Sequence, residues 1–203
     1  MGQIFRKAEP YLDQISFGEF VEIGTSRNGD DGSTKTLAEW ATRLGTTLTT
    51  IDMDPVNCEL VTSWNLPNTT VINSTGEVYM RERIFSMRPI NFLYLDNFDW
   101  DWHPEKTEDF ILEQQQRYRQ LGHTMNNVNS QRAHLAQMIA ALGHMADRCL
   151  VVCDDTWYNK WWGHYSGKSG SVIPFLLNYG FEILYTEEEP VYGTMLGKGI
   201  NQC

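Results

Sequence analysis

Short apolar runs alternate with amphipathic stretches along this chain, and the alternation predicts an α/β sheet. Seven of the runs are predicted to be β-strands: Phe20–Ile23, Leu48–Met53, Thr70–Asn73, Ile90–Asp96, Cys149–Asp154, Phe181–Thr186 and Val191–Lys198. The first five are nearly continuously apolar, as expected of parallel strands that helices cover on both faces. Helical patterns between the strands predict three helices: Thr34–Leu44, Gln131–Met145 and Val172–Asn178.

The last two predicted strands are joined by only four residues, 187–190. A link of that length cannot carry a crossover helix, so these strands should pair antiparallel. The sequence therefore predicts a single α/β domain over residues 1–203. Its expected architecture is a Rossmann-like seven-stranded sheet with a terminal antiparallel β-hairpin and helices on both faces. A dinucleotide-binding dehydrogenase would continue with a further βαβ unit instead.

The link between the fourth and fifth predicted strands, residues 97–148, is longer than one crossover helix needs. The surplus predicts an extra helix, Pro104–Leu121, followed by a polar turn at Gly122–Ser130. Long insertions over the carboxyl edge of a parallel sheet commonly serve as lids. We therefore expect the helical insert at 104–130 to cover the substrate site as a lid and to determine the choice of substrate.

A glycine turn follows the first predicted strand, within Phe20–Gly29. Glu22 ends the strand, and Gly24 would let the backbone pass close to a ligand. The segment resembles the first S-adenosylmethionine (SAM)-binding motif of class I methyltransferases, Asp/Glu-x-Gly-x-Gly-x-Gly. Ser26 stands at the second glycine, and residues 30–32 lengthen the loop. Five parallel strands followed by a terminal antiparallel pair are also the chain plan of that family.

The resemblance implies SAM as the cofactor. It assigns cofactor binding to residues at the ends of strands one, three and four: Glu22, Gly24, Ser26, Ser74 and Asp96. At the end of strand two, Asp52 is the candidate that accepts hydrogen bonds from the ribose hydroxyls, with Asp54 as the alternative. Asp54 precedes a proline, which is typical of a helix cap. A nicotinamide cofactor would satisfy the strand-two acid equally well.

Three carboxylates end the fourth and fifth predicted strands: Asp96, Asp154 and Asp155. Neighbouring parallel strands end at one sheet edge, and burying three carboxylates without a cation is costly. A hard divalent ion, most commonly Mg²⁺, would resolve the repulsion. The arrangement resembles the metal-dependent O-methyltransferases of the catechol and macrolide-sugar types, which implies that these three residues bind the metal. The alternative is that Asp154 and Asp155 cap the next segment and Asp96 only contacts SAM.

A general base would remove the proton of an acceptor hydroxyl. The catechol-type enzymes have a lysine three residues beyond the strand-four acid, and this chain has Asp99 there. His103 lies in the same loop and has a suitable ordinary pKa. Asp99 and His103 are therefore the two catalytic candidates.

The segment after strand five contains Gly167-Lys168-Ser169-Gly170 and many aromatic residues. Gly-Lys-Ser is only a fragment of a phosphate loop, because Trp162 stands where the upstream glycine belongs. The order of acidic pair, aromatic stretch and Gly-Lys-x-Gly resembles a little-characterised methyltransferase group. The aromatic side chains should either wall a substrate pocket or pack the insert onto the domain: Trp100, Trp102, Trp157, Tyr158, Trp161, Trp162 and Tyr165.

A net charge of −10 without a basic cluster argues against binding of nucleic acid or anionic membranes. No run is long and apolar enough to be a membrane span or a signal peptide. The four cysteines do not form a disulfide pattern, which favours a reducing cytoplasm.

We interpret the chain as a SAM-dependent methyltransferase that uses a divalent metal to methylate an oxygen of a small molecule or sugar, and a homodimer is left open. The alternatives are another enzyme on the same fold, such as a relative assigned as a hydroxylase, or a non-catalytic scaffold. A nicotinamide-dependent dehydrogenase ranks third. It is disfavoured because Ser26 stands at a glycine position of the turn and because the chain ends in an antiparallel pair of strands.

Overall fold

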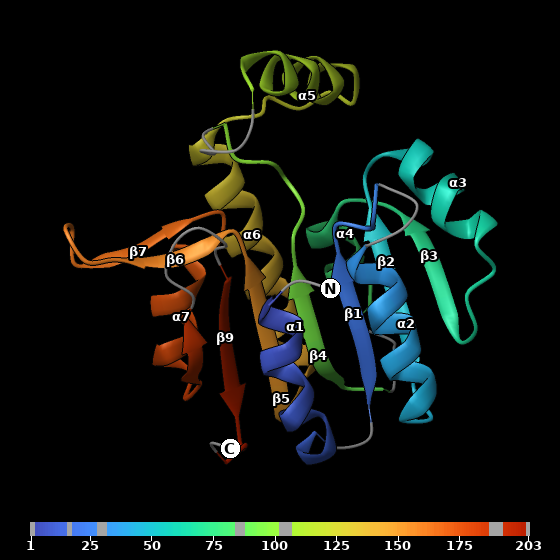
Figure 1. Cartoon of the computed structure of the whole chain (residues 1–203), viewed down its shortest axis with the longest axis vertical. Helices are drawn as coiled ribbons and strands as arrows, with labels where there is room; N and C mark the ends of the chain where they lie inside the picture. Colours follow the sequence, from blue (N-terminus) through green and yellow to red (C-terminus); the bar gives the residue numbers. More distant parts are fainter. Residues whose placement is uncertain are drawn as a thin grey trace.

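A seven-stranded, mostly parallel sheet forms the centre of the computed structural model, which describes residues 3–15, 18–27, 32–83, 88–101, 107–186 and 193–201. The strands lie in the order β3-β2-β1-β4-β5-β9-β8 (Figure 1). Their bounds are Glu19–Ile23 (β1), Thr47–Asp52 (β2), Thr69–Asn73 (β3), Ile90–Leu95 (β4), Met145–Asp154 (β5), Glu182–Thr186 (β8) and Gly193–Lys198 (β9). Strands β1 to β5 are parallel, as their apolar runs predicted.

The terminal strand β9 runs antiparallel to both of its neighbours, β5 and β8. It lies between them, so the last strand of the chain fills the space beside the parallel part of the sheet (Figure 1). The predicted antiparallel pair and the predicted Rossmann-like architecture are therefore confirmed.

Helices cover both faces of the sheet, as expected. One face carries α1 (Gln3–Ala8), the 3-10 helix η1 (Glu9–Gln14) and α2 (Ser33–Arg43). The other face carries α4 (Gly76–Glu82), α6 (Asn127–Ala141) and α7 (Val172–Asn178). Helix α3 (Pro55–Ser63) packs beside β2 and β3, and α5 (Glu108–Gln120) lies above the sheet at the edge where the parallel strands end (Figure 1). Within the described ranges, no helix combines the length and apolar character needed to cross a membrane.

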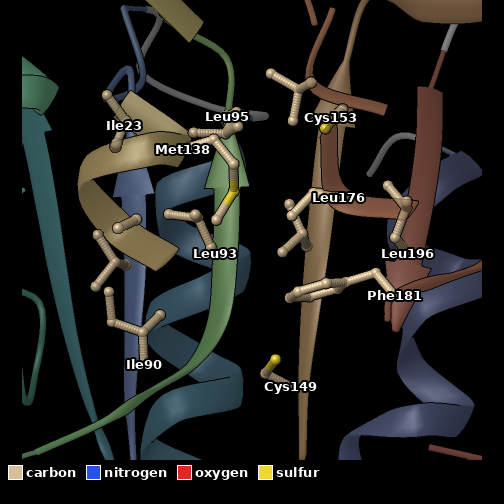
Figure 2. Close-up of a cluster of buried hydrophobic side chains, with 14 of the residues drawn as sticks. Ile23, Ile90, Leu93, Leu95, Met138, Cys149, Cys153, Leu176, Phe181 and Leu196 are labelled. Carbon is tan, nitrogen blue, oxygen red and sulfur yellow. The ribbon is translucent and has the colours of Figure 1, made fainter. Parts of the chain in front are cut away.

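Side chains that alternate along the strands divide the core into two layers. Phe20 of β1 and Phe92 of β4 stack at 5.0 Å between ring centroids, on the side of α1 and α2. Leu93 of β4 points to the opposite layer, where it joins Met138 of α6 (Figure 2). The two layers hold the parallel strands in register, so the residues that follow them meet at one edge.

The insert differs from the prediction at its second half. The extra helix is present as α5, inside the predicted Pro104–Leu121, of which residues 104–106 lie outside the described ranges. The predicted polar turn at Gly122–Ser130 is wrong from Asn127 onward, because α6 begins there. Asn126 caps this helix by accepting a hydrogen bond from the Asn129 backbone N–H at 2.8 Å. Helix α6 ends at Ala141, and the 3-10 turn Leu142–His144 leads into β5.

A two-stranded hairpin that the sequence pattern did not indicate follows β5. It consists of β6 (Thr156–Asn159) and β7 (His164–Gly167), which pair antiparallel and form a separate small sheet. The hairpin projects from the side of the main sheet near the carboxyl end of β5 (Figure 1). It returns the chain to that end, which brings residue 168 close to the acids that follow β4 and β5.

Candidate functional site

The sequence-predicted acids gather where β1, β2, β4 and β5 end. Asp52 and Asp154 are the last residues of β2 and β5, and Asp96 directly follows β4. Gly24 follows β1, and its backbone N–H donates to the Ile51 carbonyl at 2.8 Å. This edge is therefore the candidate functional site.

Glu22, predicted to bind the cofactor, is enclosed by hydroxyl groups. The side chains of Ser33, Thr34 and Thr50 donate hydrogen bonds to it at 2.5, 2.6 and 2.6 Å. Burial raises the pKa of Glu22 from its ordinary value of 4.5 to about 7, although these hydrogen bonds lower it. The contacts tie the end of β1 to the start of α2, so Glu22 shapes the turn that contains Gly24.

Gly24 occupies a backbone position that excludes a side chain. Its φ is +101°, and an added Cβ would lie 2.6 Å from the Asn97 nitrogen and 2.7 Å from the Asp96 carbonyl oxygen. Ser26, two residues on, accepts the Thr34 backbone N–H in the first turn of α2 on its Oγ at 3.2 Å. The turn is thus held tightly between the ends of β1 and β4.

Asp52 lines a cavity of about 390 Å³ at the carboxyl end of β2. Its carboxylate accepts the Asp54 backbone N–H at 2.7 Å, and burial raises its pKa. Ser74 lies beside it, because its backbone N–H donates to the Asp52 carbonyl at 3.0 Å. The structure therefore brings Asp52 and Ser74 together where β2 and β3 end, and Asp52 lines the cavity there.

Asp54, the alternative ribose ligand, is engaged by two other groups. It caps α3 by accepting the Val56 backbone N–H at 2.9 Å, and it forms a salt bridge with Arg117 of α5. Burial alone would raise the pKa of Asp54, but the Arg117 and Val56 hydrogen bonds lower it below its ordinary value. Asp54 therefore joins the insert to α3, and it lines the same cavity as Asp52.

The insert forms one wall of this cavity. Gln114, Arg117 and Tyr118 of α5 line it opposite Asp52. Tyr118 packs edge-on against Phe98 with ring centroids 4.9 Å apart, in a small apolar cluster with Met125. The insert thus lines the same cavity as Asp52. Its predicted role as a lid over the acceptor stays a prediction.

Buried polar atoms without a protein partner lie at the same edge. Among the described residues, Thr75 Oγ1 and Asn97 Oδ1 are buried and have no hydrogen-bond partner. Thr75 follows Ser74, and Asn97 lines the cavity. Buried polar groups are normally paired, so these atoms fit contacts with a polar ligand.

The three carboxylates predicted to bind a metal do converge. Asp96, Asp154 and Asp155 each offer an oxygen, and these oxygens lie within 4.8 Å of one another. Burial raises the pKa of Asp154 well above its ordinary value, and the nearby charges of Asp96 and Asp155 raise it further. The convergence that the strand ends predicted is therefore present.

A lysine that the sequence interpretation passed over lies among these carboxylates. Lys168 Nζ is 2.7 Å from Asp96 Oδ1 and 2.8 Å from Asp155 Oδ2, and the residue is only 2% exposed. Burial alone would lower the pKa of Lys168, but Asp155 and Asp96 hold it well above its ordinary value. The ammonium is therefore charged, and it neutralises part of the cluster.

Of the two catalytic candidates, only Asp99 lies within the described residues, since His103 falls outside them. Asp99 is buried, and its Oδ2 accepts a hydrogen bond from Arg27 Nη1 at 2.7 Å. Its backbone N–H donates to the Tyr118 hydroxyl at 2.6 Å. The ion pair links the glycine turn to the loop after β4, and the role of either candidate as a base stays a prediction.

The aromatic residues do not act as one group. Tyr158 and Tyr165 face each other across the β6–β7 hairpin with centroids 5.2 Å apart. Trp161 and Trp162 lie in the turn of the hairpin and are 94% and 75% exposed. For these two tryptophans both expectations are wrong, because the hairpin carries them into solvent, away from a pocket wall or the insert. Trp102 lies outside the described residues.

Comparisons with known proteins agree with the fold. No family model and no curated protein matches the chain. Among solved structures, SMU.1697c from Streptococcus mutans, assigned as a methyltransferase and solved with S-adenosylhomocysteine (SAH), is similar with a TM-score of 0.57. The sequences are 12% identical, and the match covers 98% of this chain and 99% of that chain.

Two further structures have different acceptors in their names. An rRNA methylase from Streptococcus thermophilus has a TM-score of 0.54 and 14% identity, over 98% of this chain and 97% of its own. The O-methyltransferase NovP has a TM-score of 0.56 and 7% identity, over 97% of this chain and 76% of its own. At these identities the likeness shows the fold: the chain has the Rossmann-like fold of class I methyltransferases.

Proposed function

We propose that this protein is a SAM-dependent methyltransferase. The observation that carries the proposal is the cavity at the end of β2, where Asp52 lies beside the tight turn at Gly24 and near the unpaired oxygen of Asn97. Asp52 is placed to accept hydrogen bonds from ribose hydroxyls. The SAH bound to SMU.1697c, a protein of the same fold, supports this choice of cofactor. When bound, SAM would supply an electrophilic methyl group.

The acceptor that we propose is an oxygen of a small molecule or sugar. A net charge of −10 leaves few cations to neutralise the phosphates of a nucleic acid, and this separates the chain from a typical RNA-binding protein. The cluster of Asp96, Asp154 and Asp155 lies at the ends of β4 and β5, the edge at which we place the acceptor.

The predicted divalent metal does not fit the carboxylate cluster as it is arranged. The oxygens are close enough to share an ion, but Lys168 already forms ion pairs with Asp96 and Asp155. A metal would have to displace a buried ammonium from both. We therefore assign no step of the reaction to a metal.

A binding experiment tests the cofactor. The full-length protein should bind SAM and SAH in calorimetry with a stoichiometry near one, and both ligands should raise its melting temperature. NAD and ATP serve as controls that share the adenosine but differ in the rest of the molecule. Binding of NAD in preference to SAH would overturn the proposal, as would the failure of SAM and SAH to bind.

A further inference from the structure

Lys168 is fixed in the site by the base of the β6–β7 hairpin. Its backbone N–H donates to the Asp155 carbonyl at 3.0 Å, and the Ser169 N–H donates to Thr156 Oγ1 at 3.0 Å. Gly167 has a φ of +90°, and an added Cβ there would lie only 1.9 Å from the Asp155 carbonyl oxygen. The glycine before Lys168 is thus required for the chain to approach β5 so closely.

The side chain of Lys168 bridges two elements that are far apart in the sequence. Asp96 follows β4, and Asp155 follows β5. A buried ammonium is costly unless it is paired, and here each of two carboxylates accepts one of its three N–H groups. The distances of 2.7 and 2.8 Å are those of charge-assisted hydrogen bonds. The cost of burying either charge alone is therefore offset by the other.

We propose that Lys168 is the resident cation of this carboxylate cluster, taking the position that a divalent metal would otherwise occupy. The inference rests on the proposed function in one respect: the proposed function makes this edge of the sheet the site of methyl transfer. Lys168 is a positioning residue: it holds Asp96 and Asp155 at the ends of adjacent strands and reduces their repulsion. Lys168 also makes the cluster a poor metal site. A metal must compete with its ammonium group, and the backbone hydrogen bonds of Lys168 and Ser169 hold that group in place.

Removal of the ammonium should turn the cluster into a metal site. In Lys168→Met the three carboxylates lose their resident cation and keep their oxygens, which are the ligands that hard divalent cations prefer. The test is a titration of the full-length protein with Mn²⁺. Binding is measured by electron paramagnetic resonance, as the loss of the signal of the free ion. We expect Lys168→Met to bind Mn²⁺ at least about tenfold more tightly than the wild type.

The matched control is Lys160→Met, which removes an exposed lysine at the end of β6 in the same hairpin. It should leave Mn²⁺ affinity at the wild-type level, which separates a specific site from a general change in charge. A second readout is the melting temperature: Mn²⁺ should raise that of Lys168→Met and leave that of the wild type unchanged.

The proposal is overturned if the wild type binds Mn²⁺ as tightly as Lys168→Met, or if Mn²⁺ raises the melting temperature of both. Should Lys168→Met fail to fold even with Mn²⁺, Lys168→Arg decides: this variant keeps the charge and should fold without gaining affinity for Mn²⁺, and a gain would overturn the proposal. SAH binding, measured on the same samples, is a separate result. Its absence would refute the proposed function and leave the role of Lys168 standing.

Discussion

Glu22 should make the stability of the protein fall as the pH rises from 4.5 to about 7. The carboxyl group is 0% exposed, and burial is the main cause of its raised pKa. In that pH window the folded chain keeps a proton that the unfolded chain has lost. The folded state therefore binds more protons, and the free energy of unfolding decreases as the pH rises. The loss is complete above the folded-state pKa.

The size of the effect follows from the two pKa values. A rise from 4.5 to about 7 corresponds to about 3 kcal/mol, at about 1.4 kcal/mol per pKa unit. Glu22→Gln keeps the shape of the side chain and removes its titration. Urea unfolding of both proteins at about pH 5 and about pH 8 isolates Glu22, because the other titrating groups are common to both. Relative to the wild type, the variant should gain about 2–3 kcal/mol between the lower and the higher pH.

The control is Glu59→Gln, which changes an exposed carboxylate on α3. It measures how the loss of one exposed negative charge changes the stability relative to the wild type at each pH. If the change for Glu22→Gln between the two pH values exceeds that of the control by less than about 0.5 kcal/mol, Glu22 does not titrate in this window, and the assignment of a buried, protonated carboxyl group is refuted.

Three further outcomes are expected. Asp52→Ala should weaken SAM binding by about 2–3 kcal/mol in calorimetry, since it removes charge-assisted hydrogen bonds to the ribose, and unchanged affinity would refute that role. Arg117→Ala frees α5 from Asp54 and should weaken SAM binding by a smaller factor, about threefold, because the pair is partly exposed; an effect as large as that of Asp52→Ala would contradict this order. Leu93→Ala leaves a cavity in the core layer that Figure 2 shows and should cost about 2–5 kcal/mol in urea unfolding, with no change in the slope against urea.

The sheet could be predicted from the sequence because its signals are local. Each parallel strand is an apolar run bounded by polar residues, and the predicted starts of four of the five lie within one residue of the observed ones. Strand β5 starts four residues earlier than predicted, at Met145, because polar residues in its first half interrupt the apolar run. Helix α7 has the predicted bounds, Val172–Asn178. The start of α6 was missed although Asn126 is a favoured capping residue, because a run of asparagines also suggests a turn.

The contacts of the site were harder to predict because they join distant parts of the chain. Lys168 and Asp96 are 72 residues apart, and only the unpredicted hairpin brings them together. The hairpin itself lacks the alternation of apolar and polar residues that marks a half-buried strand, since aromatic and polar residues follow each other from Trp157 to Tyr165. A local signal was present all the same: a glycine on each side of Lys168 and Ser169 indicates a backbone that must pass close to another segment.

Two segments outside the main sheet, the insert and the β6–β7 hairpin, contribute charged side chains to the site at the carboxyl edge of the sheet. The insert contributes Arg117 to the cavity beside Asp52, and the hairpin contributes Lys168 to the acids after β4 and β5. The sheet is shared, at 7–14% identity, with the proteins compared above, whose names include both an rRNA methylase and an O-methyltransferase. The sheet therefore cannot by itself select the acceptor. Under the proposed function, selection would depend on groups added at this edge, and the Lys168 ammonium is one of them.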